Sequence, residues 1–105
     1  MDFNSLMREA QRMQEEMQRK EDALKSKEYV NRAGRGIVEV RMNGEYEVTG
    51  VKLDDEFVKK FTIDDREILE DSLQLAINDV TAQVTDDKDN MMGELAGSLN
   101  IPGLR

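Results

Sequence analysis

Three Asp-Asp pairs are the residues whose type could support acid/base or metal chemistry: Asp54-Asp55, Asp64-Asp65 and Asp86-Asp87. Paired carboxylates can bind Mg²⁺ or transfer protons. Adjacent side chains point in different directions, however, and no further ligands recur at a fixed spacing around any pair. His and Cys are both absent, which removes imidazole bases, thiolate nucleophiles and the usual transition-metal ligands. We therefore interpret the pairs as helix caps and solubilising groups, and we expect no enzymatic activity, no metal and no cofactor.

Basic residues near the N-terminus suggest a different chemistry, the binding of phosphates. They lie at spacings of four, seven and one: Arg8, Arg12, Arg19 and Lys20. On a helix the first three can share one flank, and such a flank could lie along a nucleic-acid backbone. The alternative interpretation is that acidic neighbours neutralise them four residues apart, as Glu16 would for Arg12 and Glu15 for Arg19. The local sequence leaves both interpretations open.

A second basic segment, Arg32-Ala33-Gly34-Arg35-Gly36, has the glycines of a phosphate-binding loop. It lacks the following Lys-Ser/Thr and the strand, loop and helix order of nucleotide sites. We interpret residues 31–36 as a connecting loop in which Arg32 and Arg35 are candidates for contact with a nucleic-acid backbone. Arg41, in the segment that follows, is a further candidate.

The N-terminal segment is predicted to be a long amphipathic helix over residues 1–27. Its apolar residues recur at alternating steps of three and four: Phe3, Leu6, Ala10, Met13, Met17 and Leu24. The stripe is narrow and rich in Met, which favours packing along another helix over burial in a deep core. At 1.5 Å per residue the helix is roughly 40 Å long, so part of it is expected to project.

Residues 28–53 predict a three-stranded antiparallel sheet whose centre is a hairpin. Alternating apolar residues lie on both sides of Asn43-Gly44, which we interpret as the hairpin turn. Tyr46 and Val48 are predicted to share one face of the second hairpin strand. The alternation shifts by one residue after Thr49-Gly50, which predicts a β-bulge there. An isolated hairpin is marginal in water, and open sheet edges need a partner, so two copies joined through their sheets or edges are expected.

A second helix is predicted over residues 62–90, after a short turn or helical piece around Phe57. Thr62 or Asp64 can cap this helix. Its broad apolar stripe is expected to face the sheet: Ile68, Leu69, Leu73, Ala76, Ile77, Val80 and Val84. Residues 91–105 are small, apolar and rich in helix breakers, which predicts an irregular tail.

The composition is consistent with one α+β domain over residues 1–105 and a thin core. Apolar residues make up 38% of the chain and Trp is absent, so a core completed in a homodimer is favoured. The N-terminus lacks the pattern of a secretory signal and no apolar run approaches about 20 residues, so we expect a cytoplasmic protein without membrane contact. The net charge is −8, and residues 54–105 hold thirteen Asp/Glu against five Lys/Arg.

Several short segments, taken in order, carry a family resemblance: Leu6 to Gln18, Gly34 to Val38, Met42 to Gly44 followed by Val48 and Val51, Glu67 to Asp71, Ala76 to Asp79, and Ile101 to Leu104. Together they resemble the YbaB/EbfC family of small bacterial nucleoid-associated proteins over essentially the whole chain. The resemblance implies a homodimer in which strands of two chains form a shared sheet and the long helices project from it. It also implies binding of duplex DNA with modest sequence preference, in the bacterial nucleoid, with a role in its organisation or in gene regulation.

One departure from the family pattern concerns charge. Family members are expected to carry several Lys/Arg late in the last helix, whereas Thr81 to Asp89 holds one basic residue here, Lys88. Weak, strongly salt-sensitive DNA binding is therefore predicted, led by the first helix and the Arg32/Arg35 loop. The alternative is an acidic dimeric adaptor that binds a protein partner and has lost DNA binding.

Overall fold

The computed structural model describes residues 2–99 and begins with one long helix, α1 (Phe3–Ser26). The Asp2 side chain caps it, because its Oδ1 accepts a hydrogen bond from the Ser5 N–H at 2.7 Å. Lys27 is the C-cap, and its N–H donates to the Leu24 carbonyl. No residue of α1 is fully buried, as expected for a helix that lies beside the core and not inside it.

Three strands follow, β1 (Tyr29–Ala33), β2 (Val38–Met42) and β3 (Val48–Leu53), which pair antiparallel in the order β1-β2-β3. The predicted three-stranded sheet is thus confirmed. The β1–β2 turn is short because Gly34, Arg35 and Gly36 all have positive φ angles. The predicted loop over 31–36 is wrong at its start: Asn31 and Arg32 belong to β1, where they pair with Val40 and Glu39.

The β2–β3 hairpin contains the predicted bulge. Arg41 is paired with Gly50 and Met42 with Val48, which leaves Thr49 as the extra residue. The two-residue turn predicted at Asn43-Gly44 is wrong, because residues 43–47 form a five-residue connection. The Asn43 side chain organises it by accepting hydrogen bonds from the N–H groups of Glu45 and Glu47 at 2.8 and 3.1 Å. Tyr46, predicted to lie in the strand, instead takes the positive φ of 63° in this connection.

Gly44 has a role in this connection that differs from the predicted one. A Cβ atom built on it would lie 1.7 Å from the Leu24 carbonyl oxygen, near the end of α1. Its φ is not in the positive region that the predicted turn would require. Gly44 therefore allows two backbones to approach closely, and α1 abuts the hairpin there.

After β3 the chain forms a short helix α2 (Asp55–Lys59), a 3₁₀ turn η1 (Ile63–Asp65) and the long helix α3 (Arg66–Leu99). The short helical piece around Phe57 and the start at Thr62 agree with the sequence. The irregular tail predicted from residue 91 is wrong over 91–99, which are helical; residues 100–105 lie outside the described residues. Within this helical segment, Met92 and Leu95 line an apolar groove that they share with Met13 and Met17 of α1.

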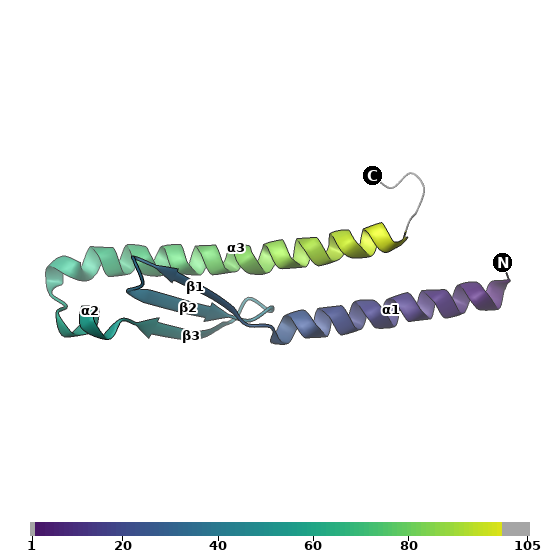
Figure 1. Cartoon of the computed structure of the whole chain (residues 1–105), viewed down its shortest axis with the longest axis horizontal. Helices are drawn as coiled ribbons and strands as arrows, with labels where there is room; N and C mark the ends of the chain where they lie inside the picture. Colours follow the sequence, from purple (N-terminus) through teal and green to yellow (C-terminus); the bar gives the residue numbers. More distant parts are fainter. Residues whose placement is uncertain (1, 100–105) are drawn as a thin grey trace.

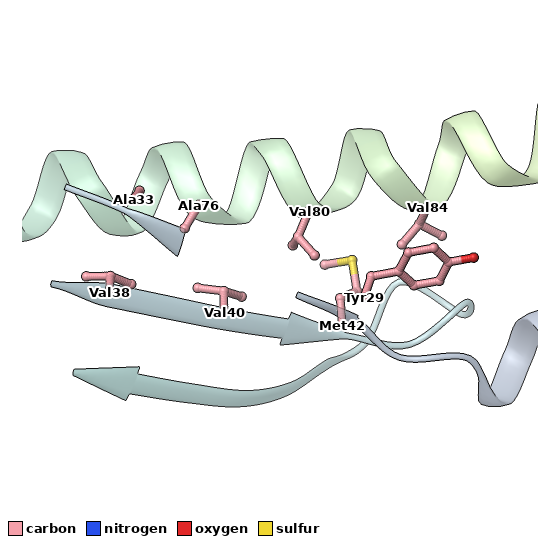
Figure 2. Packing of buried hydrophobic residues seen from close by; sticks show 8 residues of the cluster. All are labelled: Tyr29, Ala33, Val38, Val40, Met42, Ala76, Val80 and Val84. Atoms are coloured by element: carbon pink, nitrogen blue, oxygen red, sulfur yellow. The ribbon is translucent and has the colours of Figure 1, made fainter. Parts of the chain in front are cut away.

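The core lies between one face of the sheet and α3 (Figure 2). Its buried apolar residues are Tyr29, Ala33, Val38, Val40, Met42, Ala76, Val80 and Val84. Leu69 and Leu73 pack against this cluster, whereas Ile68 and Ile77 stay exposed, so the buried stripe of α3 is narrower than predicted. The core is thus a single layer of side chains, mostly Val and Ala, under one helix.

Beyond the sheet, α1 and the second half of α3 run side by side in opposite directions (Figure 1). Lys20 Nζ lies 4.0 Å from Glu94 Oε2 across the pair. The molecule measures 72 × 25 × 14 Å. We call this helical pair the arm; it leaves one end of the sheet, and α2 lies at the other end.

Candidate nucleic-acid interface

The arm presents three arginines of α1 to solvent. Arg8, Arg12 and Arg19 are all exposed, whereas Met13 and Met17 are half-buried beside α3. Spacings of four and seven residues place the three arginines on one side of the helix, away from the Met side that packs on α3. The sequence prediction of a shared basic flank agrees with this placement.

Acidic neighbours engage these arginines unequally. Arg12 contacts Glu9 and lies 3.5 Å from Glu16, and the hydrogen bond to Glu9 raises the Arg12 pKa. Arg8 Nε donates to the Asn4 carbonyl at 3.5 Å. Arg19 forms no ion pair within residues 2–99, so the predicted pair with Glu15 is absent there. Among residues 2–99, therefore, no carboxylate makes a direct contact with Arg8 or Arg19.

Lys20 lies apart from the arginines. Its Nζ is 3.7 Å from Glu16 and 4.0 Å from Glu94 of α3, and its side chain is turned toward the second helix of the arm. A lysine that bridges the two helices contributes to the arm's geometry. It is less available to a phosphate than the three arginines, because a phosphate would have to compete with two carboxylates.

Arg32 and Arg35 lie elsewhere, since β1 runs away from α1 (Figure 1). Arg32 Nη2 is 2.7 Å from Glu39 Oε1, and Glu39, whose side chain is only 11% exposed, also accepts from Arg41 at 3.1 Å. These arginines hold the pKa of Glu39 below its usual range, with the Arg41 hydrogen bond as the largest cause. Arg35 stands exposed in the β1–β2 turn. The structure therefore separates these residues from the arm.

A polar cluster that no sequence pattern indicated joins the end of α1, β1 and the hairpin to α3. Asp87 Oδ2 accepts hydrogen bonds from Lys27 Nζ at 2.8 Å and from the Tyr29 hydroxyl. Both donors, Lys27 foremost, lower the pKa of Asp87, while burial chiefly raises that of Tyr29. Lys88 Nζ lies 4.3 Å from the ring centre of Tyr46. Part of the acidic segment of α3 is therefore structural.

One carboxylate of each of the other two Asp-Asp pairs also has a structural partner. Asp54 caps α2 by accepting from the Phe57 N–H at 3.1 Å, and Asp65 accepts from the Thr62 N–H at 2.9 Å. In the described part of the chain, no cluster of three acidic side chains is arranged to hold a metal ion. No helix among the described residues is long and apolar enough to cross a membrane.

A three-stranded sheet covered by one helix, with a projecting helical arm that exposes three arginines on one side, defines a small α+β protein. The chain belongs to the YbaB/EbfC DNA-binding family, whose sequence model matches residues 1–99.

Individual relatives agree with this assignment. A nucleoid-associated protein of Clostridium novyi (strain NT) is 36% identical over 104 residues, covering 99% of this chain and 89% of the relative. One from Desulfotalea psychrophila is 35% identical over the same length, covering 99% and 95%. The crystal structure of an uncharacterized Helicobacter pylori protein matches with a TM-score of 0.69 and 25% identity, over 90% of this chain and 97% of that one.

Proposed function

We propose that this chain is a non-enzymatic, dimeric, nucleoid-associated protein that binds duplex DNA through Arg8, Arg12 and Arg19 of its arm. The observation that carries the proposal is the exposed position of all three on one side of α1, beyond the core. Phosphate contacts by such residues give affinity with little sequence preference. The family membership supports DNA as the ligand and the bacterial nucleoid as the location, with regulation of gene expression as one outcome of binding.

The other candidate residues have smaller roles in this proposal. Arg35 is exposed and can contact a backbone that passes the sheet end. Arg32 and Lys20 are already paired, with Glu39 and with Glu16 and Glu94 respectively, so each would have to exchange a carboxylate for a phosphate. We expect weak binding, because residues 54–105 repel phosphate as a group.

The homodimer is proposed to form through β3. This strand is a sheet edge, and α3 packs over β1 and β2. Val51 pairs with the buried Val40, so its side chain points to the same face, yet it is 54% exposed. Val48 is 47% exposed on this strand. A second copy that extends the sheet at β3 would cover these side chains and leave both arms free.

Val51→Glu tests the dimer. Because Val51 is exposed in the single chain, the variant should fold, but its charge should reduce the mass seen by light scattering from two chains to one at micromolar concentration. The control is Lys52→Glu, the next residue on the opposite face, which should keep the wild-type mass. A wild-type protein with the mass of one chain would contradict the dimer.

DNA binding is tested by the fluorescence anisotropy of a labelled duplex of about 30 base pairs at about 50 and 200 mM salt. Six arginines in a dimer predict a slope of log affinity against log salt of about −5, or a loss of roughly a thousandfold between these conditions. Arg12→Gln with Arg19→Gln leaves two arginines, so the loss should fall to roughly tenfold, with weaker binding at low salt.

The matched control removes the same number of charges at the other end of the molecule, by Lys59→Gln with Lys60→Gln in and beside α2. It should leave the salt slope within about one unit of the wild type. An equal effect of the two double variants would refute the arm as the site, since net charge alone would then explain binding.

The acidic adaptor is the alternative function, favoured by the excess of carboxylates in residues 54–105. It predicts no DNA binding at either salt concentration. It also predicts that one stoichiometric protein is recovered with the chain from a nuclease-treated extract of the native cell. Recovery of no such protein, together with saturable DNA binding, would exclude the adaptor.

A further inference from the structure

The first half of α1 has an uncharged side that α3 covers only in part. In the whole chain 36% of residues are charged, and within residues 3–18 the charged ones are Arg8, Glu9, Arg12, Glu15 and Glu16. At about 100° per residue, all five fall on one half of the helix circumference. The other half, which we call the uncharged side, carries only apolar side chains and the amides of Asn and Gln over about 24 Å.

The uncharged side has an exposed part and a hollowed part. Near the start of α1, Phe3 is 73% and Leu6 is 53% exposed, and Ala10 is also exposed. Farther along, an apolar groove with a volume of about 330 Å³ lies between α1 and α3, lined by Met13, Gln14, Met17, Met92, Leu95 and Ala96. Because the apolar residues recur at steps of three and four, the exposed stripe leads directly into the groove.

We propose that the uncharged side binds the same side of a second copy, with the two α1 helices antiparallel about a two-fold axis at Ala10. Phe3 and Met17 each lie seven residues from Ala10. A two-fold axis there therefore places Phe3 of each copy at Met17, in the groove of the other copy. Ala10 meets its own counterpart, and its small side chain lets the helices approach closely. A parallel pair would leave both grooves unfilled.

Charge favours a second copy as the occupant. The net charge of −8 makes two copies repel each other, so their closest contact is least costly through a side that carries no charge. A nucleic acid would require cations there, and a basic partner would favour the acidic residues 54–105. Arg8, Arg12 and Arg19 lie on the other half of α1 and stay exposed in the pair. If the proposed function holds, on which this step rests, paired arms join two DNA segments.

The size of the contact indicates a reversible pairing. A helix face about 24 Å long and 10 Å wide offers roughly 250 Å² on each copy. A stable interface buries about 600 Å² or more on each partner. The pairing of arms therefore requires a high protein concentration, and it adds to the proposed β3 dimer without replacing it.

Single cysteines test the position of the axis, because the chain has no Cys of its own. Ala10→Cys should form a disulfide between two chains under mild oxidation at least about tenfold faster than Glu15→Cys, an exposed position on the charged half of the same helix. Both rates are measured without DNA, so a failure of the proposed DNA binding does not affect them. Equal rates overturn the proposal and leave the uncharged side to an unlike partner.

Light scattering over a range of protein concentrations gives an independent test, again without DNA. The mass of the wild type should rise between low and high micromolar concentration, toward twice its starting value or more. Leu6→Glu places a charge on the uncharged side and should abolish the rise. Ser5→Glu adds the same charge to the other half of the helix and should keep it; both positions are exposed, so both variants should fold.

The starting mass and the rise report different contacts. The mass at low concentration reports the proposed β3 dimer, whereas the increase reports the arms. A wild-type mass that does not rise overturns the pairing of arms. An equal loss of the rise in Leu6→Glu and Ser5→Glu also overturns it, since net charge alone would then explain the effect.

Discussion

Gly44→Ala tests how α1 is fixed to the rest of the molecule. The added methyl carbon would lie 1.7 Å from the Leu24 carbonyl oxygen, 2.4 Å from its carbon and 3.0 Å from the Lys25 nitrogen. These are backbone atoms, so no change of side-chain rotamer relieves the clash. The end of α1 must instead move away from the hairpin by roughly 2 Å to restore ordinary contact distances.

The size of the effect depends on the free energy with which α1 docks on the hairpin. Introducing a methyl group into a close-packed site costs about 1–3 kcal/mol, and the middle of this range is expected because the exposed helix can move away. Because α1 has no fully buried residue, the strain is relieved by undocking of the helix and not by rearrangement of the core. A loss of about 2 kcal/mol in docking predicts roughly thirtyfold faster exchange of the amides in α1.

The assay is residue-resolved hydrogen exchange at constant pH, with the β2 amides as an internal reference. The matched control is Gly93→Ala in α3, where an added carbon has no neighbour within 4 Å. That substitution should stabilise the helix by roughly 0.5–1 kcal/mol. If α1 exchange in Gly44→Ala stays within about threefold of the wild type, the close contact between hairpin and helix is refuted.

Two further predictions concern the core and the polar cluster. Val80→Ala removes fully buried methyl groups between α3 and the sheet, so urea denaturation should show a loss of about 2 kcal/mol with an unchanged m-value. Asp87→Asn tests the carboxylate whose pKa is lowered by Lys27 and Tyr29. Because the pKa of Asp87 is lowered in the folded protein, its stabilisation is fully present above the unfolded value near 4 and is lost as pH falls through the folded value. The melting temperatures of the wild type and of Asp87→Asn should therefore differ at pH 7 and converge as pH falls below about 4. A difference that persists to pH 2 would contradict this assignment.

Local patterns allowed the features that depend on neighbouring residues to be predicted. The shift of alternation at Thr49-Gly50 marks a bulge because side chains in a strand must alternate between faces. The spacing of Arg8, Arg12 and Arg19 likewise places them on one side of a helix. Both inferences require only the geometry of a single element or hairpin.

The errors arose where a distant element determines the local structure. Asn43-Gly44 has the sequence of a tight turn, but Gly44 meets Leu24, twenty residues away, and the connection is longer than predicted. The segment 91–99 contains glycines that disfavour a helix, yet it packs beside α1. The Lys20 and Arg32 side chains are paired with carboxylates of other elements, which no local spacing reveals.

The elongated shape described above has a hydrodynamic consequence. The radius of gyration of one chain is 20.5 Å, which a compact protein reaches only at about 350 residues. A single chain should therefore elute from a sizing column, and scatter X-rays at small angles, like a globular protein of roughly three times its mass. An elution volume that suggests an oligomer is thus expected even from a monomer, and the mass must come from light scattering or sedimentation equilibrium, which do not depend on shape.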